Sequence, residues 1–413
     1  MSDRMPEHAA GASRPFRVDR NLRLMLGFTL VAQFQPHLAI WVVYLTDYRH
    51  LTLSQVGIME ALFWGVKLIA EVPTGAFADR FGRRLTFIVG TVIEGSGVAV
   101  FALAGTFPIL SLSYVLWSLG FAFRSGNDSA YIYDALNVEG RGAEFAQRQG
   151  RFVAALQIAF TLGGIAGAAF AARTSLAAAT LAGVVPAILA VGVLLLMQEP
   201  PRQGETRRTP YIDTLRGAWR VLRARAALRW AILYQVAISA SAPAHFLLLQ
   251  PFLAHHSVPL TWYGIALAPS GLAHAAGSIL SARLSRRLGL RRMLLLGLTS
   301  VVASLLALAT VDAAWMLPAF WFAQFATGSV DPALGGYIND RTESAVRATV
   351  LSVAPLGFSL VVMFASPLAG LTADVRLGLG FLALAAVVGL GSGGAFALWQ
   401  RADAREVPIE VPA

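Results

Sequence analysis

The chain has 413 residues, of which 56% are hydrophobic and only 14% are charged, whereas a soluble domain has about 25% charged residues. This composition excludes an ordinary soluble domain and indicates a membrane protein with many spans. The formal net charge of +10 does not indicate nucleic-acid binding, because the basic residues form short clusters between apolar runs.

The residue types give little support to catalytic or metal chemistry. The chain contains no cysteine, and its seven histidines show no H-E-x-x-H spacing. We therefore expect no cofactor, no bound metal and no enzymatic activity.

Twelve transmembrane helices are predicted, because crossing about 30 Å of hydrocarbon takes about 20 apolar residues in a helix. A polar tail at residues 1–21 precedes them without a cleavable signal pattern, and a second tail spans 401–413. Four of the predicted spans contain no charged residue, namely 174–198, 293–311, 348–373 and 377–400. The other spans carry one or a few charges and lie at about 22–46, 55–77, 85–105, 108–136, 150–172, 227–253, 262–282 and 315–338.

An internal repeat divides these spans into two halves, at 22–198 and 227–400. An offset of 207 residues superposes Pro36 on Pro243, Gly57 on Gly264 and Gly82 on Gly289. The linker at 199–226 is cytoplasmic in this scheme, and its apolar residues recur at helical spacing, which predicts an amphipathic helix on the membrane surface. A solvated basic linker is the alternative.

The basic residues predict the orientation of the chain. Loops on the side of both termini hold 28 of the 33 lysines and arginines. Cytoplasmic loops carry this excess of positive charge. We therefore expect a multi-pass protein of the bacterial cytoplasmic membrane with both termini in the cytoplasm.

The stretch EVPTGAFADRFGRR, from Glu71 to Arg84, carries a family resemblance. It resembles the G-x-x-x-D-R-x-G-R-R signature of the major facilitator superfamily, at the loop between the second and third helices. The resemblance implies an all-α fold of two pseudo-symmetric six-helix bundles around a central cavity. The residues before the signature, together with SGNDSAYIYDAL in the fourth helix, resemble a bacterial subgroup near drug and metabolite exporters.

The signature residues are predicted to form a conformational latch. Asp79 is expected to face a helix N-terminus of the other half, and the arginines are expected to pair with acids such as Asp134 or Glu139. These contacts would stabilise the outward-open arrangement. The alternative is that the arginines only follow the positive-inside rule. The proposed latch residues are Gly75, Asp79, Arg80, Gly82, Arg83 and Arg84.

Charged residues inside the spans are costly and therefore invite a functional interpretation. In helix four, Arg124 and Asp128 are four residues apart and are expected to pair on one face. The resemblance places this helix beside the cavity, with Asp134 at its inner mouth. The alternative is a pair that only neutralises itself. The candidate cavity residues are Arg124, Asp128, Tyr131, Asp134, Gln33, His37, Tyr234 and His245, and the candidate buried charges are Glu60, Lys67, Glu71 and Glu94.

Two of these buried charges, Lys67 and Glu71, are expected to pair, whereas Glu94 has no obvious partner in the sequence. Helix five resembles the exporters' glycine pattern at Gly163 and Gly167, but Gly164 stands where proline is expected, which weakens the case for proton antiport. Small residues for close helix packing explain the pattern equally well.

The sequence therefore predicts a secondary transporter that works by alternating access and exports a small organic or amphiphilic compound in exchange for protons. Proton-coupled uptake of a nutrient or metabolite is the alternative within this class. Two alternatives lie outside the transporter class: a membrane-embedded enzyme, and a membrane sensor that kept the fold but does not transport. The expected partners are a small-molecule substrate, protons and the lipid bilayer, without nucleic acid, and the chain is expected to be a monomer.

Overall fold

The computed structural model describes residues 16–201, 220, 222–342, 347 and 350–405, and this part of the chain is helical with no strand. Most of the linker, including its predicted amphipathic helix, and the outer parts of both tails lie outside the described residues.

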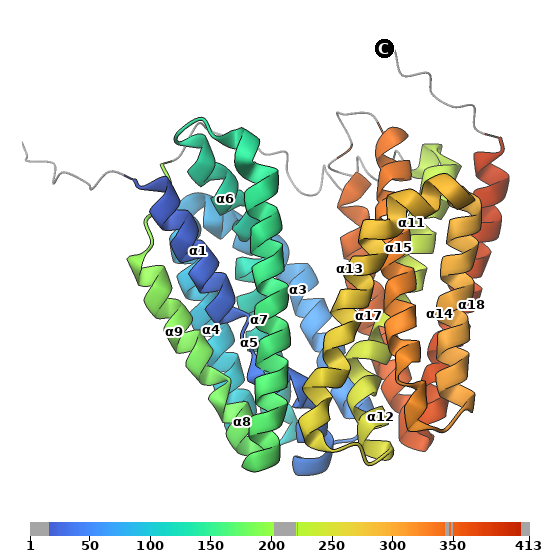
Figure 1. The fold of residues 1–413 in the computed structure, drawn as a ribbon, viewed down its shortest axis with the longest axis horizontal. Helices are drawn as coiled ribbons and strands as arrows, with labels where there is room; N and C mark the ends of the chain where they lie inside the picture. The colour runs from blue at the N-terminus through green and yellow to red at the C-terminus, as the bar shows by residue number, and fades with distance from the viewer. Residues whose placement is uncertain (1–15, 202–219, 221, 343–346, 348–349, 406–413) are drawn as a thin grey trace, which may run out of the picture.

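The helices form two bundles, drawn blue to green and yellow to red (Figure 1). The first bundle contains α1 (Val18–Ala32), η1 (Pro36–Ala39), α2 (Trp41–Val43), η2 (Tyr44–Tyr48), α3 (Leu53–Phe81), α4 (Arg83–Leu103), α5 (Phe107–Arg124), α6 (Asn127–Asn137), η3 (Gly142–Glu144), α7 (Phe145–Arg173), α8 (Leu176–Ala182) and α9 (Val184–Leu196). The second contains α11 (Ala226–Ile238), η4 (Ser239–Ser241), η5 (Ala244–Leu248), α12 (Leu249–His255), η6 (Leu260–Trp262), α13 (Tyr263–Leu288), α14 (Leu290–Thr310), η7 (Ala314–Met316), α15 (Pro318–Asp340), α17 (Val353–Val375) and α18 (Leu377–Asp403).

These elements account for the twelve predicted spans. Among the described residues, ten helices are long and apolar enough to cross a membrane, and a pair bent by 51°, Val18–Ala39 with Trp41–Tyr48, supplies one more. The remaining predicted span corresponds to α15, which has 23 residues and packs against α13 and α14. The prediction of an all-α fold in two bundles is confirmed.

Local sequence explains where the signature helix begins and ends. At the start of α3, Thr52 accepts a hydrogen bond from the backbone of Gln55 at 3.2 Å while Gln55 accepts one from the backbone of Thr52 at 3.0 Å, which is a capping box. The helix ends at Gly82, whose φ of 96° favours glycine. Gly289, its repeat counterpart, also has a positive φ, of 74°.

Glu199 secures the turn at Gly82. Its two carboxylate oxygens accept hydrogen bonds from the backbone N–H groups of Arg83 and Arg84, both at 2.7 Å, so this acid caps the N-terminus of α4. A Cβ added at Gly82 would lie 2.7 Å from the carboxyl carbon of Glu199.

We expect Gly82→Ala to destabilise the protein by about 1 kcal/mol more than Gly289→Ala. Both variants place a Cβ in a backbone conformation that is essentially open to glycine alone, with φ 96° and ψ 160° at Gly82 and φ 74° and ψ 153° at Gly289, which costs about 1 to 3 kcal/mol. A Cβ at Gly289 would meet no atom of the described residues within 4 Å, whereas Gly82→Ala also displaces the helix cap made by Glu199. Thermal unfolding of the purified variants in detergent measures the difference, and equal losses would contradict the importance of the cap.

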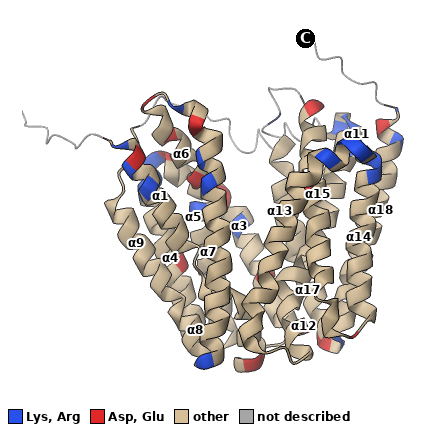
Figure 2. Ribbon diagram, in the orientation of Figure 1, with Lys and Arg blue, Asp and Glu red and all other residues tan. Residues whose placement is uncertain are grey.

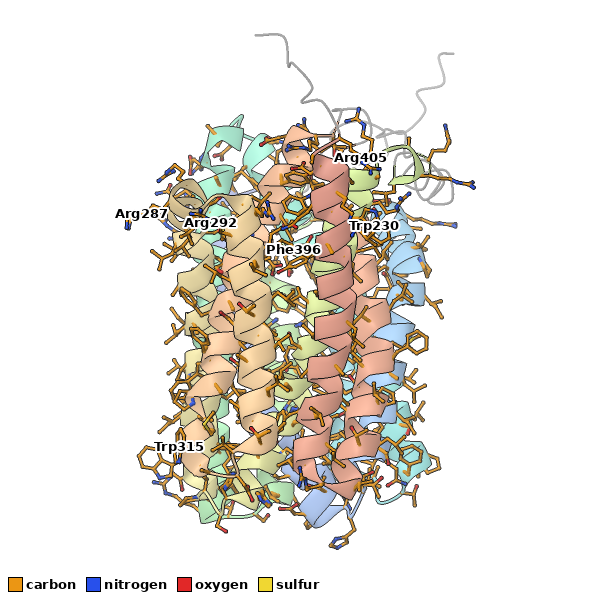
Figure 3. The ribbon with its side chains drawn as sticks, turned by 90° about the vertical axis from the view of Figure 1, so that its right-hand side faces the viewer. Trp230, Arg287, Arg292, Trp315, Phe396 and Arg405 are labelled. Carbon is orange, nitrogen blue, oxygen red and sulfur yellow. The ribbon has the colours of Figure 1, made fainter. Side chains whose placement is uncertain are left out.

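Charge and exposed apolar residues show how the bundles lie in a membrane. Large apolar side chains face outward along the helices, for example Ile279, Val375 and Leu390, each 79% exposed. Lysines and arginines gather at one end, which is also where the described chain begins and ends (Figure 2). We call this the arginine-rich end and its counterpart the opposite end. Trp230 lies toward the arginine-rich end and Trp315 toward the opposite end (Figure 3), as expected for side chains at the two membrane surfaces.

The two bundles touch through a pair of helix crossings, α3 with α17 and α7 with α13. Glycines related by the repeat lie at both. A Cβ at Gly57 would lie 2.5 Å from the carbonyl oxygen of Ser366, and one at Gly264 would lie 2.5 Å from that of Gly164. Only glycine therefore allows the backbones to approach this closely at the two crossings.

Candidate functional site

A cavity of about 1280 Å³ lies between the bundles. Its wall is mainly apolar and aromatic, with contributions from α3, α7, α13, α15 and α17. Binding sites for small organic compounds have this character, with a few polar groups that orient the ligand. The polar lining includes Gln33, Lys67, Gln235, His245, His274 and Asp331.

At the opposite end, Asp374 joins the two bundles. It lies in the last turn of α17, and its carboxylate accepts hydrogen bonds from the backbone N–H groups of Leu53 at 2.7 Å and Ser54 at 3.0 Å. These are the first two residues of α3. A carboxylate is favourable there because unpaired N–H groups and the helix dipole make a helix N-terminus positive.

Gln250 of α12 makes a second contact between the bundles. Its amide donates to the carbonyl oxygen of Leu38 at 3.0 Å and accepts from the backbone N–H of Val42 at 2.9 Å. In a continuous α-helix these two backbone groups would bond to each other. The amide of one bundle is therefore inserted into the broken helical turn of the other, at the bend near Ile40.

The latch residues lie at the arginine-rich end. Arg83 contacts Asp134 of α6 at 2.6 Å, one of the pairings expected from the sequence, and also donates to Asn127 at 3.1 Å. Arg84 donates to the carbonyl oxygen of Leu194 at 3.1 Å. These contacts stay within one bundle, whereas Gln250 and Asp374 join the bundles at the opposite end. The latch role remains a prediction.

Two further residues of the signature lie in the last turns of α3. The guanidinium of Arg80 lies 5.3 Å from the ring centre of Phe81, and Asp79 is exposed. The other suggested latch acid, Glu139, contacts Arg141 at 3.0 Å instead of a signature arginine. Carboxylates of Glu144, Asp19 and Glu139 around Arg141 raise the pKa of its guanidinium and keep it charged.

Glu94 and Arg124 form a buried ion pair, with 3.1 Å between Oε2 and Nε and only 7% exposure of each side chain. The N–H does not point at the oxygen, so the contact is electrostatic and not an aligned hydrogen bond. Gln35 donates to the other Glu94 oxygen at 3.2 Å. Gly120 permits this arrangement, because a Cβ there would lie 2.5 Å from the Glu94 backbone nitrogen.

This pair corrects the expected pairing of Arg124 with Asp128. The prediction assumed one continuous helix, but α5 ends at Arg124 and α6 begins at Asn127, with Gly126 left-handed at φ 74°. Residues four apart across this break do not share a face. Asp128 lies in the first turn of α6, near Arg124 and Glu94, and three residues after Ser125 of the cavity wall.

The structure separates the other candidate cavity residues into two groups. Gln33 and His245 line the cavity. Tyr131 and Tyr234 are buried inside the bundles, where their hydroxyls donate to the carbonyl oxygens of Gln198 at 2.8 Å and Leu294 at 2.6 Å. His37 is also buried, with its ring 5.5 Å from that of Trp117.

The candidate buried charges Glu60, Lys67 and Glu71 lie on α3, and Lys67 lines the cavity. Lys67 contacts Glu71 at 2.8 Å, as the spacing predicts. Glu60 accepts a hydrogen bond from the indole of Trp64 at 3.3 Å, and the Trp64 ring lies 5.0 Å from that of Phe358 in the other bundle. Both aromatic residues line the cavity.

Gly163 and Gly167 of α7, the fifth predicted span, allow this helix to pack closely against its neighbours. A Cβ at Gly163 would lie 2.7 Å from the backbone nitrogen of Gln35, and one at Gly167 would collide with the backbone of Pro36. The contact of α7 with η1 inside the first bundle therefore depends on them.

Asp331 is the cavity residue that the sequence analysis missed. It lies on α15, its carboxylate accepts a hydrogen bond from Gln235 at 3.4 Å, and it interacts electrostatically with His274. All three residues line the cavity. An acid inside a predicted span next to Pro332 was the signal that could have identified it.

Comparisons with known proteins agree with this architecture. A sequence model described as Major Facilitator Superfamily matches residues 24–311 and 244–413. Multidrug resistance protein 1 of Bacillus subtilis (strain 168) is 27% identical over 158 residues, which are 38% of this chain and 40% of that protein. The tetracycline resistance protein, class C, of Escherichia coli is 25% identical over 283 residues, which are 64% of this chain and 66% of that protein.

Coverage of the relatives is uneven. An uncharacterised transporter of the same type, YxaM of Bacillus subtilis (strain 168), is 33% identical over 22% of this chain and 23% of its own. The matches to Multidrug resistance protein 1 and to YxaM thus span less than half of each protein.

Solved structures share the fold over nearly the whole chain. A mutant of the nucleoside transporter NupG has a TM-score of 0.76 at 12% identity and covers 94% of this chain and 99% of that one. A bacterial homologue of the human lysosomal transporter Spinster, inward-facing and occupied, has a TM-score of 0.71 at 17% identity and covers 96% and 98%.

Proposed function

The chain belongs to the major facilitator superfamily, and on that premise we propose that it is a secondary transporter that exports a small amphiphilic compound in exchange for protons. The observation that carries the proposal is the cavity between the bundles, together with the contacts of Asp374 and Gln250 that join the bundles at the opposite end. A cavity reachable from one side is one of the two states that alternating access requires.

The contacts at the opposite end support one state of the proposed cycle. With the arginine-rich end in the cytoplasm of a bacterium, as the positive-inside rule requires, the cavity is inward-open and Asp374 and Gln250 form its outer seal. The signature residues at the cytoplasmic end would then engage the other bundle only when that end closes. In this proposal Asp374 and the latch thus favour opposite states.

The lining of the cavity favours an amphiphilic substrate. Aromatic residues such as Trp64, Phe160 and Phe358 offer apolar surface, while Gln235, Gln324 and Thr327 offer hydrogen bonds. The names of two relatives, a multidrug resistance protein and a tetracycline resistance protein, support export of organic compounds.

Asp331 is the group we assign to proton or cation binding. It lines the cavity beside His274 and Gln235, and an acid inside the membrane is costly to keep without a functional role. Protonation of its carboxylate would remove a charge from the cavity, and deprotonation would provide a site for a cationic substrate. Asp128, the candidate from the sequence, is retained as a second titrating group.

The test is transport in liposomes with an imposed pH gradient and a panel of amphiphilic compounds. We expect pH-driven flux in the wild type and, in Asp331→Asn, flux reduced to the level of empty liposomes. Asp128→Asn is measured in parallel. Asp340→Asn is the matched control, because Asp340 lies exposed at the end of the same helix, and its flux should equal that of the wild type.

Three outcomes of the same transport experiment would contradict parts of the proposal. Flux driven in the uptake direction would replace export with symport. Compound binding without flux would indicate a sensor that kept the fold. Unchanged coupled flux in both Asp331→Asn and Asp128→Asn would show that neither acid couples protons to transport.

A further inference from the structure

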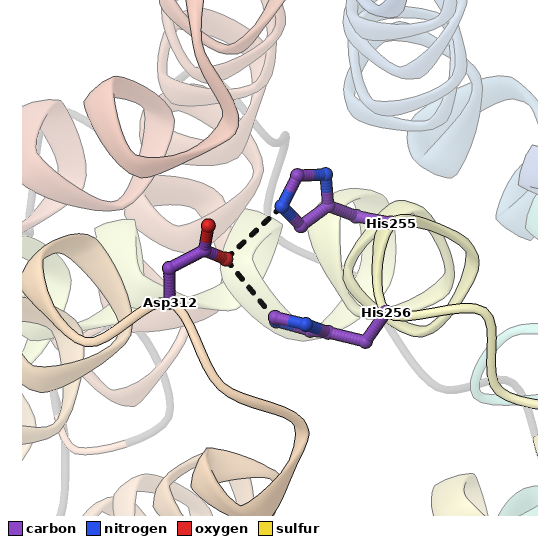
Figure 4. A group of neighbouring side chains, drawn as sticks. All are labelled: His255, His256 and Asp312. Carbon is purple, nitrogen blue, oxygen red and sulfur yellow. Dashed lines mark hydrogen bonds and ion pairs between the residues drawn. The ribbon is translucent and has the colours of Figure 1, made fainter.

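Two adjacent histidines at the opposite end face one carboxylate. His255 is the last residue of α12 and His256 is its C-cap, while Asp312 lies in the turn between α14 and η7. The Nε2 atom of His255 lies 3.0 Å from Oδ1 of Asp312, and that of His256 lies 3.5 Å from the same oxygen (Figure 4). The three potential ligand atoms all lie within 4.8 Å of one another.

The two separations between histidine and carboxylate fit neighbouring ligands of a metal ion. Zinc bonds to histidine nitrogen at about 2.0 to 2.1 Å and to carboxylate oxygen at similar length, so neighbouring ligands of a tetrahedral zinc lie about 3.3 Å apart. The two nitrogen–oxygen distances, 3.0 and 3.5 Å, lie on either side of that value. A single His–Asp hydrogen bond would need only one imidazole near this oxygen.

The backbone holds the two histidines in place. Ser257, with φ 53°, follows them in the left-handed conformation. The N–H of Ser257 donates to Ala254 at 2.9 Å, and that of Val258 donates to Leu253 at 2.9 Å. Together these bonds form a Schellman motif, which fixes the end of α12.

Packing and a short turn fix the remaining groups. The His256 ring lies 4.5 Å from the ring of Phe252 at an interplanar angle of 69°, and its side chain is only 12% exposed. On the other side, the turn that carries Asp312 is closed by a hydrogen bond from the N–H of Ala313 to the carbonyl oxygen of Val311 at 3.1 Å. Ligands held in this way lose little freedom when a metal binds.

We propose that His255, His256 and Asp312 form a binding site for a divalent transition metal, with zinc as the ion it takes most readily. Two imidazoles and one carboxylate are a ligand set that suits zinc, whereas calcium and magnesium prefer oxygen ligands alone. Water completes the fourth position, because His255 and Asp312 are 51% and 76% exposed. The site joins the end of α12, the helix that carries Gln250, to the turn after α14.

The expectation of no bound metal rested on the lack of cysteine and of an H-E-x-x-H pattern, in which the ligands lie on one helix. Here two ligands are adjacent and the third comes from a turn 56 residues beyond His256. Folding of the second bundle alone brings them together.

Zinc binding to the purified, untagged full-length chain in detergent tests the proposal. Equilibrium dialysis against Zn²⁺ should give one tightly bound ion per chain. Either His256→Ala or Asp312→Ala should weaken binding at least about tenfold. Substituted Co²⁺ should give the visible spectrum of a tetrahedral nitrogen and oxygen site, and the same two variants should lose it.

His50→Asn is the matched control, since His50 is exposed at the same end of the protein and its left-handed φ of 56° is one that asparagine tolerates. This variant should bind zinc like the wild type. Melting temperatures without metal establish that all variants are folded. No binding by the wild type, or equal binding by wild type and His256→Ala, would overturn the proposal and leave only a His–Asp ion pair.

Discussion

Under the proposed alternating-access mechanism, replacing Gly57 with alanine is expected to shift the protein away from the arrangement seen here, in which α3 and α17 cross closely at Gly57. The new Cβ would lie 2.5 Å from the carbonyl oxygen of Ser366 and 2.9 Å from Cα of Pro367, so α3 and α17 could no longer meet as closely. Overpacking of this kind costs about 1 to 3 kcal/mol, which corresponds to a change of roughly 5- to 150-fold in the ratio of the two states. Gly264→Ala should act alike at the equivalent crossing of α13 with α7.

Spin labels measure this shift directly, because the chain contains no native cysteine. Labels attached through Gln147→Cys on α7 and Arg287→Cys on α13 report the separation of the bundles at the arginine-rich end. We expect Gly57→Ala to increase the population with short distances between these labels.

Gly65→Ala is the matched control on the same helix. Among the described residues, its Cβ would meet only the sulfur of Met363, at 3.3 Å, and that flexible side chain can move aside. Its distance distribution should therefore equal that of the unsubstituted protein. An equal shift in both variants, or in neither, would contradict the role assigned to the close crossing at Gly57.

Replacing Arg124 with leucine should lower stability by about 3 to 5 kcal/mol, because it leaves the Glu94 carboxyl buried without its opposite charge. The double variant Arg124→Leu with Glu94→Gln should recover much of this loss, since no unpaired buried charge remains. Thermal unfolding of the single and double variants in detergent forms a double-mutant cycle that isolates the pair.

Arg141, which pairs with acids near the protein surface, provides the control for this cycle. Arg141 pairs with Asp19, Glu139 and Glu144, and its side chain is 25% exposed. Surface ion pairs are worth about 0 to 1 kcal/mol each, so Arg141→Leu should cost much less than Arg124→Leu. If the two losses were alike, or if the double variant showed the sum of its single losses, the pair would not act as a coupled buried unit.

Features that depend on residues close together in the sequence could be predicted from the sequence alone. The contact of Lys67 with Glu71 follows from their spacing on one helix. The repeat also anticipated that Gly82 and Gly289 occupy equivalent turns, both with positive φ. The predicted pairing of Arg124 with Asp128 was wrong because it also relied on spacing along one continuous helix. Gly126 breaks that helix, so the two residues do not share a face.

By itself, the sequence determined the order and the approximate positions of the membrane spans and the position of the signature turn. The physical reason is that lipid offers no hydrogen-bond partners, so each apolar stretch must satisfy its backbone within its own helix. Only the tertiary structure decided which helix faces meet. Three contacts depend on packing between helices. They are the Glu94–Arg124 pair, the hydrogen bonds of Gln250 to Val42 and Leu38, which lie 208 and 212 positions earlier in the chain, and the bond of Asp374 to Leu53, which lies 321 positions earlier. No local pattern encodes such contacts, because they arise from how whole helices fit against one another.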